Sequence, residues 1–152
     1  MAKPLLRIDG DVEQPLELAF DDLREFPERD QVQDVSQLNP NRRGGGVTLR
    51  SILDRAKPNP SAAYLTLHAS TDGFAASVRL EAVQERGILV YRLDGSALPV
   101  SAGGPIRFFI RDSAACRTDE LDDCANVKFV DRIEITTEPG QDTRYENGAA
   151  NE

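Results

Sequence analysis

The two cysteines are the residues of this chain best suited to chemistry. Cys116 and Cys124 lie eight positions apart, whereas zinc knuckles leave about two to four residues between their ligands. The carboxylates around them, within residues 112–123, are hard ligands and would form an unusual set with soft thiolates. Three interpretations stay open: two free thiols, one disulfide bond made where the segment folds back, or a metal site. We expect residues 112–123 to form a mobile insertion between two strands.

The only histidine of the chain is a weak candidate for catalysis. His68 falls within residues 63–69, where apolar and polar side chains alternate as they do in a half-buried strand. We therefore expect a strand histidine rather than a catalytic or ligating one. The sequence also contains neither a G-x-S-x-G nucleophile motif nor a Walker A motif. No catalytic residue is assigned from these patterns.

A basic, glycine-rich stretch is the best candidate for a binding site. Arg42 and Arg43 directly precede Gly44–Gly46, and Thr48 can cap the helix that follows. Glycines let backbone amides approach a ligand, and a helix N-terminus adds a partial positive charge. The pattern is typical of a site for a small anion, although the same residues could form an ordinary solvated loop.

The totals limit the class of protein. The chain has 152 residues, of which 39% are hydrophobic and 29% are charged, as expected for one globular domain. Its net charge of −8 opposes binding to nucleic acid or to an anionic membrane, so we expect neither as a partner. The first residues lack a secretory signal, and no apolar run could span a membrane. We therefore expect a cytoplasmic protein with reduced cysteines; a protein partner cannot be assigned.

Short strands dominate the elements that must position these residues. The Gly10-Asp11 turn signal predicts a strand pair over 4–9 and 14–19. Further strands are predicted over 31–36, 63–69, 75–79, 88–93, 106–111 and 127–137, and helices over 20–26 with Asp21 as N-cap, from the Thr48 cap to Pro58, and over 80–85. Residues 37–46 are predicted as a loop. Because strands and helices do not alternate regularly, an α+β or mainly β fold is favoured over a doubly wound sheet.

Four stretches, in order, resemble the oxidoreductase molybdopterin-binding (sulfite oxidase-like) domain family. They read LRIDGDVEQPLELAFDDLREFP, GGGVTLRSILDRA, AYLTLHASTDGFAASVRLEAV and ILVYRLDGSALPVSAGGPIRFFI. NVKFVDRIEIT is similar to the closing strand of the family. The resemblance implies the sulfite oxidase-type molybdopterin-binding fold, with residues 1–137 as one domain. Residues 138–152, polar and without periodicity, are predicted as a disordered acidic tail.

The family resemblance also implies a cofactor, a pterin dithiolene that carries molybdenum. In the family a cysteine thiolate between the first helical turn and the glycine-rich helix entry completes the sulfur ligands of the metal. The corresponding interval here, QVQDVSQLNPNRR, contains no cysteine, and Ser36 lies at or near the vacant position. The tryptophan that usually precedes the glycine is missing as well. Molybdopterin is thus a candidate cofactor, whereas bound molybdenum is not expected and no metal ligand is assigned.

The remaining matches fall on the positions that shape the family's pocket. The resemblance places the following residues there: Ser36, Arg42, Arg43, Gly44, Gly45, Gly104, Pro105, Arg107 and Lys128. Each also has a structural alternative, since Gly104-Pro105 could be only a turn and Lys128 only a solvent-facing strand residue. Two functions follow. One is a molybdopterin-binding oxidoreductase-like domain without bound molybdenum. The other is a non-catalytic binding module on the same fold that recognises a small anionic ligand or a protein partner.

Overall fold

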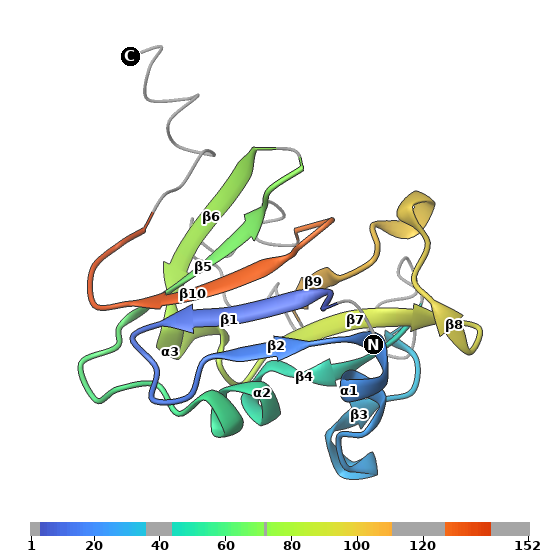
Figure 1. The fold of residues 1–152 in the computed structure, drawn as a ribbon, viewed down its shortest axis with the longest axis horizontal. Helices are drawn as coiled ribbons and strands as arrows, with labels where there is room; N and C mark the ends of the chain where they lie inside the picture. The colour runs from blue at the N-terminus through green and yellow to red at the C-terminus, as the bar shows by residue number, and fades with distance from the viewer. Residues whose placement is uncertain (1–3, 36–43, 72, 111–126, 141–152) are drawn as a thin grey trace.

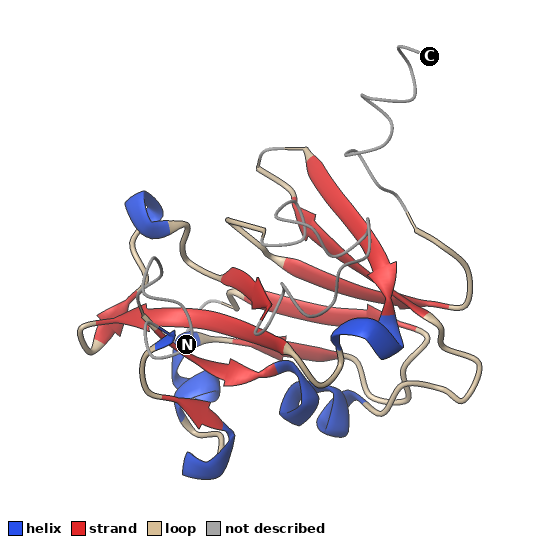
Figure 2. Ribbon diagram, turned by 180° about the vertical axis from the view of Figure 1, so that it is seen from behind, coloured by secondary structure: helices blue, strands red, loops and turns tan. Residues whose placement is uncertain are grey.

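Two five-stranded β-sheets make up most of this computed structural model, which describes residues 4–35, 44–71, 73–110 and 127–140 (Figure 1). Within these residues the structure gives bounds for three short α-helices and for two 3-10 turns, η1 (Glu28–Asp30) and η3 (Val100–Ala102). Figure 2 shows how far the strands outweigh the helices. The predicted class, an α+β fold that is mostly β with a few short helices, is confirmed. No helix in the described ranges is long and apolar enough to cross a membrane.

The first sheet joins the two ends of the described chain. It consists of β1 (Leu6–Gly10), β2 (Leu16–Leu18), β5 (Tyr64–Ala69), β6 (Phe74–Arg79) and β10 (Arg132–Thr136), in the order β2-β1-β10-β5-β6. The predicted β1-β2 hairpin is confirmed. The last strand, β10, lies in the middle of the sheet, parallel to β1 and antiparallel to β5.

The second sheet is built around β7. It consists of β3 (Gln31–Val32), β4 (Gly45–Thr48), β7 (Gly87–Leu93), β8 (Ser96–Ala97) and β9 (Arg107–Ile110). β7 pairs antiparallel with β4, β8 and β9. Asp94 and Gly95 join β7 to β8 with positive φ angles of 53° and 83°, the conformation of a tight type I′ hairpin turn.

The structure confirms one of the two N-cap residues that the sequence predicts. α2 (Leu49–Ala56) begins as predicted, because the Thr48 hydroxyl accepts a hydrogen bond from the Ser51 N–H at 3.3 Å. In α1 (Phe20–Arg24) the prediction of Asp21 as N-cap is wrong. Ala19 holds that position, and its N–H donates to the Asp22 carboxylate at 2.8 Å. α3 (Leu80–Val83) is a single turn after β6.

Both sheets contribute to one main core, and a second small cluster lies on the other face of β7. The main core contains, among others, Ile8, Leu65, Leu67, Leu89, Tyr91, Phe108, Ile133, Ile135 and the buried face of α2. The small cluster consists of Val35, Ile88, Val90, Leu98 and Phe109. β7 is therefore buried on both faces, as its apolar run Ile88–Tyr91 indicates.

Three predicted boundaries are wrong. The loop predicted over 37–46 does not include Gly45 and Gly46, which pair with β7 as part of β4. The strand predicted over 31–36 is confined to Gln31–Val32. The strand predicted over 127–137 begins only at Arg132, because residues 127–130 hydrogen-bond along 103–108 instead.

The segment predicted as the start of a tail lies against the first sheet. The Gly140 N–H donates a hydrogen bond to the Ser77 hydroxyl at 2.9 Å. A side chain at Gly140 would overlap the hydroxyl of Thr66, which is fully buried. Residues 141–152, the acidic segment 112–123 and both cysteines fall outside the described residues.

Candidate functional site

Two of the glycines matched to the family's pocket meet at Leu98. A Cβ placed on Gly44 would lie 3.6 Å from Leu98 Cδ1, and one placed on Gly104 would overlap the Leu98 carbonyl oxygen. Leu98 is buried, and its N–H donates to the Tyr91 carbonyl at 3.0 Å. The structure thus brings the glycine-rich stretch at the start of β4 next to the Gly104-Pro105 segment, which contains a cis peptide bond.

The two matched cations flank the next glycine. A Cβ on Gly103 would lie 3.2 Å from both Arg107 Cδ and Lys128 Cγ. The Gly103 carbonyl accepts a hydrogen bond from the Phe129 N–H at 2.8 Å, which holds the segment that carries Lys128 in place. Gly103 has a positive φ of 98°. The side chains of two cationic residues, Arg107 and Lys128, therefore both lie against the buried Gly103.

The remaining matched positions, Ser36, Arg42 and Arg43, fall outside the described residues. The residues on either side of that segment are joined to each other, since the Val35 N–H donates to the Gly44 carbonyl at 2.8 Å. The expected helix N-terminus is not at this point, because β4 separates Gly44 from the first turn of α2. The Thr48 hydroxyl and Ser51 also use part of that terminus for capping. Of the three glycines, Gly45 and Gly46 belong to β4 and pair with β7, and Gly44 directly precedes that strand.

A polar network that the sequence does not reveal adjoins these glycines. The Tyr91 hydroxyl, on a side chain only 1% exposed, donates to Gln31 Oε1 at 2.9 Å. Gln31 Nε2 in turn donates to the carbonyls of Leu23 and Phe26 at the end of α1, at 2.9 and 3.2 Å. The Phe20 ring packs edge-on against Tyr91 at 5.5 Å. Tyr91 is therefore held on several sides.

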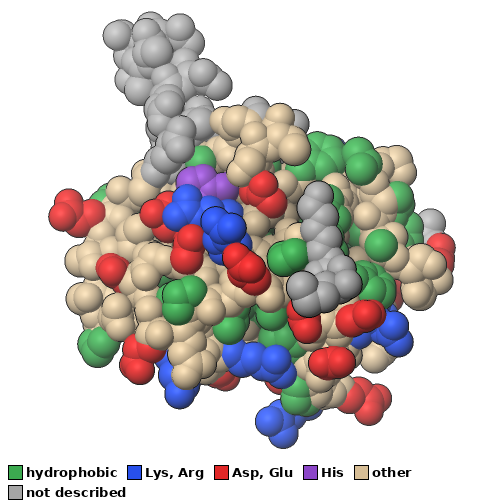
Figure 3. All heavy atoms as spheres, in the orientation of Figure 1, with side chains coloured by type: hydrophobic (Ala, Val, Ile, Leu, Met, Phe, Trp, Pro, Cys, Tyr) green, Lys and Arg blue, Asp and Glu red, His purple; other side chains and the backbone are tan. Residues whose placement is uncertain are grey.

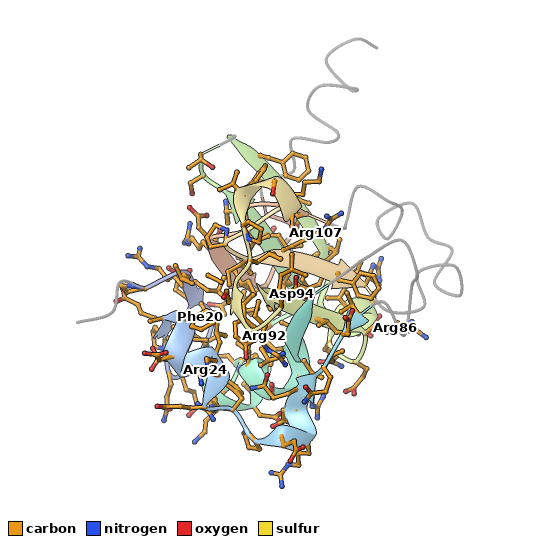
Figure 4. All side chains as sticks on the ribbon, turned by 90° about the vertical axis from the view of Figure 1, so that its right-hand side faces the viewer. Phe20, Arg24, Arg86, Arg92, Asp94 and Arg107 are labelled. Carbon is orange, nitrogen blue, oxygen red and sulfur yellow. The ribbon has the colours of Figure 1, made fainter. Side chains whose placement is uncertain are left out.

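Arg92 completes this network. Its Nε donates to the Tyr91 hydroxyl oxygen at 3.2 Å. Its Nη2 lies 3.4 Å from the Val32 carbonyl and 3.5 Å from Gln31 Oε1. A Cβ on Gly45 would come within 2.5 Å of the guanidinium carbon and Nη1. Gly45 is thus a glycine because the Arg92 guanidinium occupies the place of its side chain. Figure 4 labels Arg92 beside Phe20 and below Asp94 in that view.

His68 belongs to a different network, on the outer face of the first sheet. Its Nε2 lies 3.0 Å from Glu134 Oε1, and its side chain is 15% exposed. Arg132 pairs with Glu134 at 3.6 Å and with Asp9 at 2.9 Å. Figure 3 shows the histidine beside basic and acidic side chains on this face. The expectation of a half-buried strand histidine is confirmed.

Two cavities lie away from the family-matched glycines and from Arg92, and the larger adjoins the His68 network through Arg132. One, of about 420 Å³, is lined by residues that include Leu6, Arg7, Ser70 and Arg132. The other, of about 300 Å³, lies between the start of β5 and α3. Within the described ranges no group of three or more His, Cys, Asp or Glu side chains could hold a metal ion.

The architecture defines the class of this protein: an α+β domain in which two mainly antiparallel sheets share one core. The model of the family described as oxidoreductase molybdopterin binding domain matches residues 3–145. The chain belongs to this family, and the resemblance predicted from the sequence is confirmed.

One solved structure shows the same fold at low identity. It is the sulfane dehydrogenase SoxCD from Paracoccus pantotrophus, with 20% identity and a TM-score of 0.63. The match covers 88% of this chain and 38% of that chain, so the protein described here spans well under half of that length. A search of curated proteins finds no match.

Proposed function

We propose that this domain binds the pterin phosphate of a molybdopterin-type ligand without supplying a protein thiolate to molybdenum. The observation that carries the proposal is the pair of cations, Arg107 and Lys128, on either side of Gly103. Charge-assisted hydrogen bonds from such side chains are the usual means of binding a phosphate. Membership of a molybdopterin-binding family supports the identity of the ligand.

The donor atoms fit the anionic part of that ligand and do not fit the metal. No cysteine precedes Cys116 in the chain. The described residues that gather around Leu98 and Gly103 offer nitrogen and oxygen atoms only. A serine oxygen at position 36 would be a harder and more basic ligand than a thiolate, and soft sulfur ligands suit this metal centre. We therefore assign no redox step and no catalytic residue to the domain.

The test is to analyse protein produced in a host that synthesises molybdopterin. Pterin would be measured by fluorescence after oxidation, and molybdenum by elemental analysis. We expect pterin to copurify with the protein and molybdenum to be far below the amount of pterin. Stoichiometric molybdenum that is lost in Ser36→Ala would overturn the proposal.

Charge-matched variants show whether the pterin binds where we propose. The double variant Arg107→Gln/Lys128→Gln should lose the pterin. The double variant Arg24→Gln/Arg29→Gln, which removes the same charge from exposed positions around α1, should keep it. If neither pterin nor phosphate binds to the wild-type protein, a module for a protein partner becomes the better explanation.

A further inference from the structure

We infer that Arg92 is a second anion-binding residue, held in place to accept an oxyanion such as a phosphate or carboxylate group. The inference rests on the proposed function and deepens it, because it adds a cation that the family resemblance does not single out. It depends on three observations: how the guanidinium is held, which of its nitrogens donates no hydrogen bond among the described residues, and the fact that Arg92 forms no ion pair with a carboxylate in the part of the chain that the structure describes.

Two of the three guanidinium nitrogens are engaged by neutral oxygens. Nε donates to Tyr91, and Nη2 lies near the Val32 carbonyl and Gln31. Tyr91 is itself fixed by its hydrogen bond to Gln31 and by its contact with Phe20. The guanidinium is therefore held before any ligand arrives, which reduces the entropy lost on binding.

The third nitrogen, Nη1, donates no hydrogen bond to any residue that the structure describes. It lies directly over Gly45, where any side chain would collide with it. The absence of a side chain at Gly45 is what allows the guanidinium to lie there. Nη1 carries two N–H groups, and the planar guanidinium suits the oxygens of a phosphate or carboxylate.

The charge of Arg92 is not balanced by a described carboxylate. Arg7, Arg24, Arg50 and Arg132 each form an ion pair with an acidic side chain. The partners of Arg92 are a tyrosine hydroxyl, an amide oxygen and a backbone carbonyl. A partly buried cation without a counter-ion is costly, so an anion supplied by a ligand would stabilise this arrangement. A neutral side chain could connect β3 to β7 equally well if the role were structural alone.

The inference is tested by titrating the protein with inorganic phosphate at fixed ionic strength while following the side-chain Nε–H resonances of the arginines. We expect the Arg92 resonance to shift with saturation. Arg92→Gln should weaken phosphate binding about tenfold or more, a ratio that corresponds to about 1.4 kcal/mol. Arg92→Lys should retain part of the affinity, because it keeps the charge and loses the planar fork. Arg24→Gln, the charge-matched control, should bind as the wild type does.

The outcomes separate the inference from the proposed function. If pterin or phosphate binds and Arg92→Gln binds equally well, with no shift at Arg92, the inference is overturned while the proposed function stands. If pterin does not copurify and phosphate still binds through Arg92, the proposed ligand is wrong and the inference stands. Should Arg92→Gln fail to fold, Arg92→Lys and the arginine resonances of the wild type still decide the matter.

Discussion

Replacing Gly45 with alanine should destabilise the protein only while Arg92 is present. The new methyl group would come within 2.5 Å of the guanidinium carbon and Nη1, so the side chain must move. Its hydrogen bond to Tyr91 at 3.2 Å, and the longer contacts to Val32 and Gln31, would then be lost or weakened.

The size of the effect follows from these contacts. A hydrogen bond from a charged donor contributes about 1.5–3 kcal/mol. Alanine recovers about 0.5–1 kcal/mol of backbone entropy, because Gly45 does not have a positive φ. We therefore expect Gly45→Ala to reduce the free energy of unfolding by about 1–2 kcal/mol. At this chain length that corresponds to a Tm lower by about 2–8 °C.

A double-mutant cycle identifies the cause. In an Arg92→Ala background the methyl group meets no guanidinium, so Gly45→Ala should be neutral or slightly stabilising. Urea denaturation followed by circular dichroism gives the four free energies of unfolding. Gly46→Ala is the control, because its Cβ would meet the Leu89 carbonyl, and removing Arg92 should not rescue it. Equal losses for Gly45→Ala in both backgrounds would refute the placement of the guanidinium over Gly45.

Three further substitutions test other parts of the fold. Leu67→Ala, at a fully buried position between the sheets, should cost about 2–5 kcal/mol in urea denaturation; a cost below that of an exposed site would contradict the core assignment. Thr48→Ala should cost about 1 kcal/mol through loss of the α2 cap, and Thr48→Ser should restore most of it. Gly140→Ala should lower the Tm because its methyl group overlaps the Thr66 hydroxyl, and Thr66→Ala should relieve that loss; an unchanged Tm would place Gly140 away from the sheet.

Patterns among neighbouring residues predicted where strands and helices lie better than they predicted which residues contact each other in the fold. The alternation of residues 63–69 gives β5, and Thr48 marks the start of α2, because both depend on neighbours in the sequence. Gly45 and Gly46 led to a wrong prediction of a loop for a physical reason. Glycine is favoured in a mobile loop and equally where another backbone or side chain comes close. Only the fold shows that Leu89 and Arg92 are the groups that come close.

In the candidate site, too, the sequence pointed only to residues that a local or family pattern marks. Family resemblance draws attention to Gly103's neighbours Arg107 and Lys128, and the fold brings these two together. Arg92 carries no such signal. It follows an apolar run within a strand, and its role depends on Tyr91 beside it and on Gln31, sixty-one positions earlier. A contact between residues so far apart cannot be derived from spacing.

The central position of β10 has a consequence for how the chain folds during synthesis. Arg7 pairs with Arg132, and β5 reaches β1 only through β10. A nascent chain that ends before residue 132 can form the β1-β2 and β5-β6 hairpins but cannot join them. Contacts between such distant segments form slowly, and unjoined strand edges favour aggregation. We therefore expect the first sheet to be completed only after β10 has left the ribosome, with both hairpins exposed to chaperones until then.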